Sequence, residues 1–343
     1  MSHALLNTGE WWSSWHVPNH PIQGMAFVMA TTGYRLPDVI MDIALDVDGR
    51  GEYTYIARRI SKQKEFSAGD IPVTSAGWYA FDSSDPRMIG YDYCTPDYVM
   101  GSLIIDPTLP RVESRVGSDL EEGYPALTCQ NRYHAIVFYS DINARVVPQC
   151  EGLGNRKTYG EQQAVQHKNV LLVQRHAKSK TTGDMRVIWG GKGMRSRIVE
   201  IDGWMILKEG DAWLGVKGFS RTKVNEPCGS TWDNDVILRM NDGKAPVAFV
   251  AGRIEDFSNI DAFTKYLHGF TGKLEKGRFI LAEGSKDFLS LHLESGALPE
   301  IYGKPINLNP DTLFDSPFMS SVHGSGVVTI EKGNRKLIIE LGS

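Results

Sequence analysis

Residues 197–217, RIVEIDGWMILKEGDAWLGVK, decide the fold class of this chain. They contain three short runs rich in β-branched and aromatic residues, a composition typical of strands. Asp202-Gly203 separates the first two runs and Gly210-Asp211 the last two. Such pairs favour the tight turns of β-hairpins. The stretch therefore predicts three consecutive antiparallel strands.

The same pattern continues on both sides of this stretch. Short apolar runs recur along the chain, and Gly-centred turns such as Lys332-Gly333-Asn334 separate several of them. The other predicted strands cover residues 26–30, 51–60, 133–139, 170–175, 186–189, 246–250, 278–281, 288–293, 326–331 and 335–341. Strands this short and this closely spaced predict stacked antiparallel sheets.

Helical periodicity is scarce, and residues 259–268 carry the clearest helix pattern. We expect Ser258 to cap its first amides, with Asp261 three residues later as in a capping box. The predicted helix has one apolar stripe, made of Ile260, Phe263 and Leu267. Gly269 is expected to end it.

Together these patterns predict a mainly β fold, a large antiparallel multi-sheet β-sandwich (super-sandwich) with one or a few short helices. No linker-like run divides the chain, so we expect a single unit over 1–343. The alternative is two sub-layers, with the main sheets in 1–225 and the C-terminal sheets and short helix in 226–343. Residues 104–125 and 149–164 are predicted to be long loops, either functional or simply covering a sheet edge.

Composition narrows the function classes. A hydrophobic content of 41% allows a substantial core, and a net charge of -4 without a Lys/Arg block argues against nucleic-acid binding. No run approaches the roughly 20 apolar residues of a membrane span. The N-terminus lacks the features of a signal peptide. These observations predict a cytoplasmic protein, or an excised piece of a longer secreted or periplasmic one.

Two segments give the best clue to a family, namely residues 93–101 (YCTPDYVMG) and 163–172 (QAVQHKNVLL). Seven further segments accompany them in order: GYRLPDVI (33–40), HAI (134–136), WMI (204–206), DAWLGV (211–216), VAFVAGR (247–253), PINL (305–308) and FDSPF (314–318). The order resembles bacterial and fungal proteins in which an (α/α) toroid precedes a multi-sheet β-sandwich. These are related in layout to heparinase-II/III-like and chondroitin- or alginate-lyase-like polysaccharide lyases.

The resemblance covers the sandwich half, and no toroid helices are predicted in this sequence. It implies a polysaccharide or oligosaccharide ligand and a helical toroid domain, on the same or another chain, as partner. We therefore expect an excised segment, a split gene or a naturally reduced relative.

A lyase acting on a uronic acid must neutralise the carboxylate, remove the C5 proton and protonate the leaving oxygen. Arg132, Tyr133 and His134 bring suitable groups together at the start of a predicted strand. Arg132 and His134 would share one face of that strand. The alternative is a surface-paired arginine and a histidine hydrogen-bonded at a sheet edge. Tyr98 is a fourth catalytic candidate, as a proton donor.

Other residues are candidates for contacting a sugar. Gln166 and His167 either contact the substrate or simply begin a strand, and Asp97 either contacts it or forms an Asx turn that fixes the next strand. An aromatic cluster at the N-terminus is expected either to stack on sugar rings or to anchor a neighbouring domain. Its members are Trp11, Trp12 and Trp15.

A metal site is not predicted. His134, His167 and Asp141 are conceivable ligands for a divalent ion, but no HxH, HExxH or calcium-loop spacing supports them. We therefore expect no cofactor.

The function predicted from these residues is that of a carbohydrate-active protein. It resembles the sandwich half of a polysaccharide lyase acting on a uronic-acid-containing polysaccharide. One alternative is a non-catalytic glycan-binding or docking module that pairs with a helical toroid domain. Another is a glycoside hydrolase, for which Asp97, Asp141 and Glu161 are the candidate carboxylates.

Overall fold

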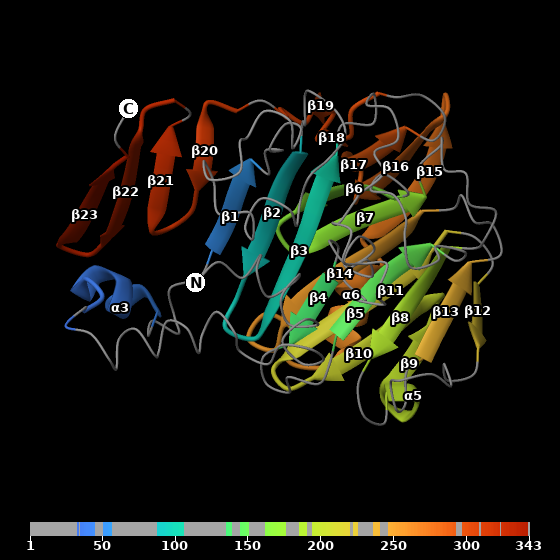
Figure 1. Cartoon of the computed structure of the whole chain (residues 1–343). Helices are drawn as coiled ribbons and strands as arrows, with labels where there is room; N and C mark the ends of the chain where they lie inside the picture. The colour runs from blue at the N-terminus through green and yellow to red at the C-terminus, as the bar shows by residue number, and fades with distance from the viewer. Residues whose placement is uncertain are drawn as a thin grey trace, which may run out of the picture.

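Strand pairing dominates the chain, and the described strands form three antiparallel sheets (Figure 1). This confirms the predicted mainly β, multi-sheet β-sandwich. The computed structural model describes residues 33, 35–44, 51–56, 88–105, 135–138, 145–150, 162–175, 185–190, 194–219, 222–225, 236–240, 246–292, 297–308, 310–322 and 324–341.

The large sheet gathers strands from both ends of the chain. β1 (Gly51–Ile56) pairs with β20 (Thr312–Asp315), which joins N-terminal and C-terminal parts into one sheet. On the side of β1 away from β20, the sheet continues in spatial order with β2 (Met88–Cys94), β3 (Tyr98–Ile105), β4 (Ala135–Phe138), β5 (Arg145–Cys150), β8 (Met185–Gly190), β13 (Val236–Met240) and β12 (Thr222–Asn225). Beyond β20 lie β21 (Met319–Val322), β22 (Val327–Lys332) and β23 (Arg335–Glu340).

The central sheet contains the most apolar strands. Its spatial order is β6 (Gln162–His167), β7 (Val170–Arg175), β14 (Val247–Arg253), β11 (Ala212–Gly218), β10 (Trp204–Glu209) and β9 (Ile198–Ile201). β14 inserts between β7 and β11, although it lies far from β7 in the sequence.

The small sheet and the helices complete the fold. The small sheet consists of β15 (Phe270–Glu275), β16 (Arg278–Glu283), β17 (Lys286–His292), β18 (Glu300–Ile301) and β19 (Lys304–Pro305). The helices within the described residues are α3 (Asp38–Ala44), α5 (Met194–Arg197) and α6 (Ile260–Leu267). None of them is long and apolar enough to cross a membrane.

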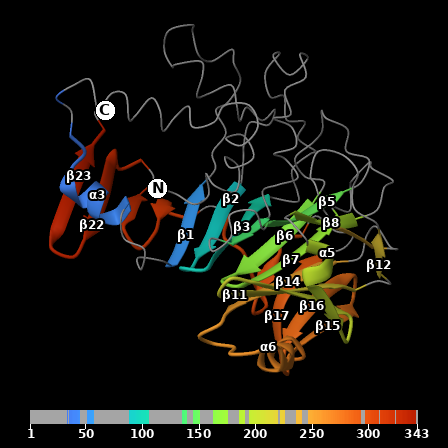
Figure 2. The ribbon, with the colours of Figure 1, turned by 90° about the horizontal axis from the view of Figure 1, so that it is seen from below.

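The sheets stack in three layers with the central sheet in the middle (Figure 2). On one side Leu171, Leu214 and Phe249 pack against Met100 and Trp189 of the large sheet. On the other face, Leu172, Trp213 and Val250 of the same strands pack against Phe263 of α6 and Leu289 of the small sheet. Each buried side chain of this size contributes about 1.5–3 kcal/mol. Burial on both faces explains why these strands read as continuous apolar runs.

The hairpins predicted from the opening stretch are confirmed. β9, β10 and β11 pair consecutively, with the turns at Asp202-Gly203 and Gly210-Asp211. Asp202 and Gly203 both have positive φ, 50° and 78°, as a type I′ turn requires. The turn at Gly333 joins β22 to β23, also as predicted.

Several local predictions are wrong. Residues 104–105 and 149–150 belong to strands rather than loops, and so do residues 162–164 of β6. The polar residues of β6 concealed that strand, because Gln163 and Gln166 are buried although their side chains are polar.

The predicted cap of α6 is also displaced by one residue. Asn259, not Ser258, accepts the hydrogen bond from the Ala262 amide, at 2.9 Å. The helix itself is confirmed, with Phe263 and Leu267 buried on its apolar side. The two sub-layers suggested as an alternative stay a prediction. Strands that follow residue 225 enter all three sheets.

Candidate functional site

The two segments that carried the family resemblance lie side by side. Residues 93–101 span the turn between β2 and β3, and residues 163–172 span the turn between β6 and β7. Gln166 Nε2 donates to the Met100 carbonyl at 2.8 Å. The Lys168 amide donates to the Tyr91 hydroxyl at 3.0 Å. We name the polar residues gathered here the hairpin junction, which consists of Glu52, Tyr91, Tyr93, Asp97, Lys168 and Arg253.

Strand register places the junction tyrosines on the inner face of the large sheet. Tyr93 pairs with Met100 across the β2–β3 ladder, so the two side chains share a face. Met100 is buried against the central sheet. Glu52 pairs with Tyr93 from the other side. Tyr91, two residues before Tyr93, therefore also faces the central sheet at its β6 edge.

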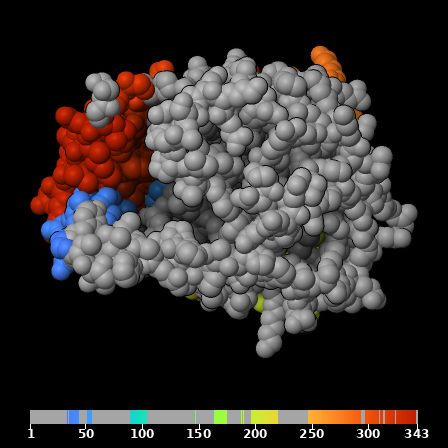
Figure 3. All heavy atoms as spheres, viewed as in Figure 1, coloured from blue at the N-terminus to red at the C-terminus, as the bar shows by residue number. Residues whose placement is uncertain are grey.

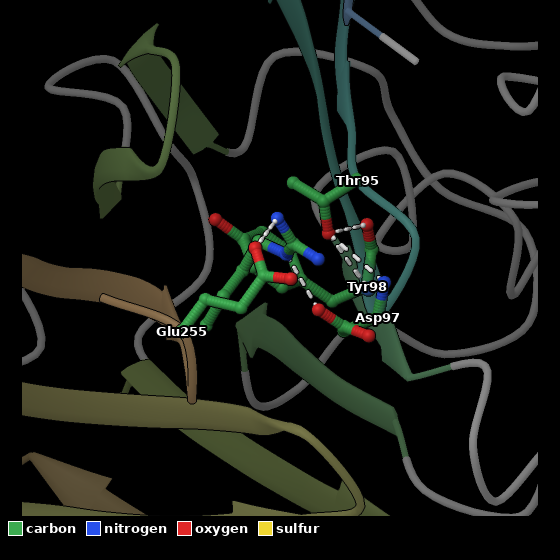
Figure 4. Close-up of polar contacts among 5 residues, drawn as sticks. Thr95, Asp97, Tyr98 and Glu255 are labelled. Carbon is green, nitrogen blue, oxygen red and sulfur yellow. Dashed lines mark hydrogen bonds and ion pairs between the residues drawn. The ribbon is translucent and has the colours of Figure 1, made fainter. Parts of the chain in front are cut away.

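The β2–β3 turn is organised by a threonine rather than by an aspartate. Thr95 Oγ1 accepts from the Tyr98 amide at 3.0 Å and from the Asp97 amide at 3.2 Å. The Asx turn predicted at Asp97 is therefore wrong. The Asp97 carboxylate points instead toward the central sheet, where Arg253 ends β14 (Figure 4).

Arg253 links two layers of the stack. Its Nε donates to Asp97 Oδ2 at 2.5 Å, and its Nη1 donates to Glu255 Oε2 at 2.6 Å (Figure 4). The side chains of Arg253 and Asp97 are 25% and 15% exposed. Burial lowers the pKa of Arg253, but the hydrogen bond and charge of Asp97 offset this and raise it overall. This guanidinium is therefore a permanent cation at the junction.

A second polar group surrounds Tyr91. Its hydroxyl donates to Glu52 Oε2 at 2.6 Å. Lys168 Nζ lies 3.9 Å from Glu52 Oε1. Burial and the neighbouring Glu52 carboxylate raise the pKa of Tyr91, so its hydroxyl stays protonated.

Tyr93 is the junction residue with an available hydroxyl. Its side chain is half-buried, and its ring centroid lies 6.3 Å from that of Tyr98. Among the described residues its hydroxyl has no hydrogen-bond partner. Burial raises the pKa of Tyr93, Glu52 and Asp256 raise it further, and Arg253 opposes them. At neutral pH Tyr93 is thus a proton donor and not a base.

The β6–β7 turn that carries Lys168 is firmly held. Asn169 Nδ2 donates to the Ala251 carbonyl at 2.7 Å and to the Tyr266 hydroxyl at 3.2 Å. The Ala251 amide in turn donates to the Asn169 carbonyl at 2.9 Å. These bonds tie the turn to β14 and α6, so the junction is built on a rigid support.

The predicted pair Gln166 and His167 does not face one site. Gln166 is buried toward the large sheet, where its amide nitrogen bonds the Met100 and Lys168 carbonyls. The His167 ring points to the small sheet, 5.7 Å from Phe288 and 5.8 Å from Tyr302 between centroids. Alternation along β6 separates their side chains.

The other predicted site residues divide into two groups. Tyr98 is buried in the core between the large and central sheets, and Asp97 is paired with Arg253. The remaining candidates lie outside the described residues; they are Trp11, Trp12, Trp15, Arg132, Tyr133, His134, Asp141 and Glu161. The strand predicted to carry Arg132 and His134 is present as β4, whose described part begins at Ala135.

Sequence reasoning missed Glu52, Tyr91 and Arg253. Tyr93 and Lys168 lie within the two resemblance segments but were not predicted as site residues either. The available signal for Arg253 was a charged residue ending an otherwise apolar strand within VAFVAGR. Nothing local marked Glu52, because its role depends on pairing with a strand about forty residues away.

No protein-family model matches the chain, and no curated protein matches it. The function of the site is therefore inferred from the hydrogen-bonding groups, charges and aromatic rings of the hairpin junction. Within the described residues, no group of three or more His, Cys, Asp or Glu side chains is placed to hold a metal ion.

The junction presents both donors and acceptors beside aromatic rings. Tyr93, Lys168 and Arg253 offer N–H and O–H donors, while Glu52 and Asp97 offer acceptors. Tyr302 is exposed and contacts the His167 ring, so it extends the aromatic surface on the side of the β6–β7 turn that faces the small sheet. Rings with polar neighbours of both kinds suit the alternating C–H and O–H groups of sugars.

His167 is expected to make stability depend on pH. Burial lowers its pKa from 6.5, so the unfolded chain takes up this proton first as the pH falls. The contribution of the neutral His167 ring to folding stability is therefore fully present above the pKa of histidine in the unfolded chain. It is lost as the pH falls below that value towards the lower pKa of the folded protein. Between pH about 8 and about 5, the wild type should lose more stability than His167→Phe, whose ring keeps the aromatic contacts. Urea unfolding at both pH values measures this, and an identical pH dependence in the two proteins would contradict it.

Proposed function

We propose that this chain is the β-sandwich part of a carbohydrate-active protein related in layout to polysaccharide lyases, and that it binds polysaccharide at the hairpin junction. The observation that supports this most is Tyr93, a half-buried tyrosine whose hydroxyl has no hydrogen-bond partner among the described residues. It lies where the two resemblance segments meet, with Glu52 across the strand pair and Arg253 at the end of β14.

The proposed reaction is β-elimination on a uronic-acid residue. A base removes the C5 proton, the electron pair forms the C4–C5 double bond, and the bond from C4 to the leaving oxygen breaks. Tyr93 gives its proton to that oxygen, a role that suits a tyrosine with a raised pKa. Arg253 and Lys168 supply positive charge for the substrate carboxylate. We assign the base to the Arg132–His134 segment, which lies outside the described residues.

A second candidate is a non-catalytic glycan-binding module that docks onto a helical toroid domain. Two observations favour it. Arg253 is already paired with two carboxylates, Asp97 and Glu255, which reduces its attraction for a uronate. In addition, the pKa values of Tyr91, Tyr93 and Tyr98 are all raised, chiefly by burial, so none of these tyrosines is suited to act as the base.

Tyr93→Phe tests the proposal with little risk to the fold, because the hydroxyl it removes has no partner in the described part of the chain. The purified chain is incubated with uronic-acid polysaccharides, and ultraviolet absorbance of the conjugated double bond is followed. We expect Tyr93→Phe to lower kcat/KM at least about a hundredfold. Tyr98→Phe, which removes a hydroxyl from a buried neighbour, should stay near wild type.

The outcomes separate the two candidates. Full activity in Tyr93→Phe would overturn the role of Tyr93. No product from the wild type, together with retarded migration in polysaccharide-containing gels, would support the binding module. In that case Tyr93→Ala should weaken the retardation, whereas a wild type without product or retardation would contradict both candidates.

A further inference from the structure

β23 forms one edge of the large sheet as far as the structure describes it. Within the described residues β23 is the last strand in the order, and only β22 pairs with it (Figure 1). The C-terminal strands form one exposed end of the molecule (Figure 3). Open edges are templates for pairing with another strand.

Hydrogen bonding within the β22–β23 ladder determines which backbone groups face outward. The Leu341 amide donates to the Gly326 carbonyl at 2.6 Å, in line with the ladder. Bonded and non-bonded residues alternate along an antiparallel strand. Residues 335, 337, 339 and 341 therefore bond toward β22. The N–H and C=O groups of Lys336, Ile338 and Glu340 point to the open edge.

Apolar side chains are exposed next to this edge. Helix α3 covers the face of the ribbon that carries Lys332 and Arg335, since both of these side chains bond to Asp42. Ile339 lies on that face and is 38% exposed, whereas Ile338 lies on the opposite face and is 54% exposed. Isoleucines exposed on both faces of an edge strand are unusual for a surface that stays in water.

We propose that β23 pairs antiparallel with β23 of a second copy of this chain, with Ile338 facing Ile338 across a two-fold axis. In this register, the outward N–H and C=O groups of one β23 strand face the outward N–H and C=O groups of the other. It places Lys336 opposite Glu340 twice, and Leu337 opposite Ile339 twice. Each of these pairs stabilises an antiparallel ladder. The sequence KLIIE of residues 336–340 is thus complementary to itself when reversed.

Neighbouring registers are less favourable. A shift of two residues, which also keeps outward groups together, places Ile338 opposite Lys336 or opposite Glu340. Both shifts lose the two opposite-charge pairs. The two-fold arrangement also closes the edge of each copy, so the assembly ends at two chains rather than growing into a fibre. The pairing does not involve the hairpin junction and does not depend on the proposed function.

Charge reversal tests the pairing on the full chain. Sedimentation equilibrium of the wild type should give twice the mass of one chain. Lys336→Glu and Glu340→Lys each bring like charges opposite each other, and each should raise the dissociation constant at least about tenfold. The double variant Lys336→Glu/Glu340→Lys restores opposite charges and should dimerise like the wild type.

Two results would overturn the proposal. One is a wild type that stays a single chain at micromolar concentration, which would leave the edge for a strand of another protein or of this chain. The other is a double variant that dimerises as weakly as the single variants. Circular dichroism of all four proteins checks that each is folded, and Ile338→Pro provides a second variant. Its proline removes only an outward N–H, so it should abolish dimerisation while leaving the β22–β23 ladder intact.

Discussion

Trp204→Ala is expected to lower the free energy of unfolding by about 3–5 kcal/mol. Trp204 is 0% exposed and packs in the core that joins the central sheet to α6 and the small sheet. The fit around it is close. A Cβ added at Gly215 would lie 2.6 Å from Leu267 Cδ1 and 3.2 Å from Trp204 Cε3. Truncation therefore leaves a cavity that the neighbouring side chains cannot easily fill.

Trp204→Phe is the matched control for this substitution. Trp204 Nε1 has no hydrogen-bond partner in the part of the chain that the structure describes, so phenylalanine removes part of the ring system and no hydrogen bond seen there. We expect Trp204→Phe to cost well under half as much as Trp204→Ala. Denaturant unfolding followed by far-ultraviolet circular dichroism measures both. Equal midpoints for the two variants would contradict close packing at this position.

Arg253→Met is expected to cost about 1–3 kcal/mol, between the values typical of surface and of buried ion pairs. The substitution keeps the aliphatic stem but leaves Asp97, whose side chain is only 15% exposed, without its cation. The large and central sheets also lose their cross-layer ion pair at the junction. Asp97→Asn and the double variant complete a double-mutant cycle that isolates the interaction between the two side chains.

Arg335→Met supplies a surface comparison. Arg335 donates to Asp42 Oδ2 at 2.7 Å, but the side chains are 48% and 42% exposed. We expect this change to cost less than about 1 kcal/mol. A coupling energy near zero in the Arg253 cycle, or equal costs at both arginines, would show that the junction pair does not hold the layers together.

The sequence alone determined the elements whose signal is local. β7 (VLLVQR) was predicted at its observed limits, because an apolar run of this length with β-branched residues is typical of a buried strand. The turns at Asp202-Gly203 and at Gly333 were also predictable, since positive φ angles favour these residues. The apolar stripe of α6 was sufficient to predict that helix.

Only the tertiary structure decided how distant elements meet. β1 joins β20, β14 enters between β7 and β11, and polar β6 becomes a strand because its glutamines are buried between layers. The candidate site was likewise formed by contacts between residues far apart in the sequence. Residues 93–101 and 163–172 were recognisable as segments, but their contact and the pairing of Asp97 with Arg253 were not. Pairing between distant residues depends on the packing of whole layers, which no short stretch of sequence encodes.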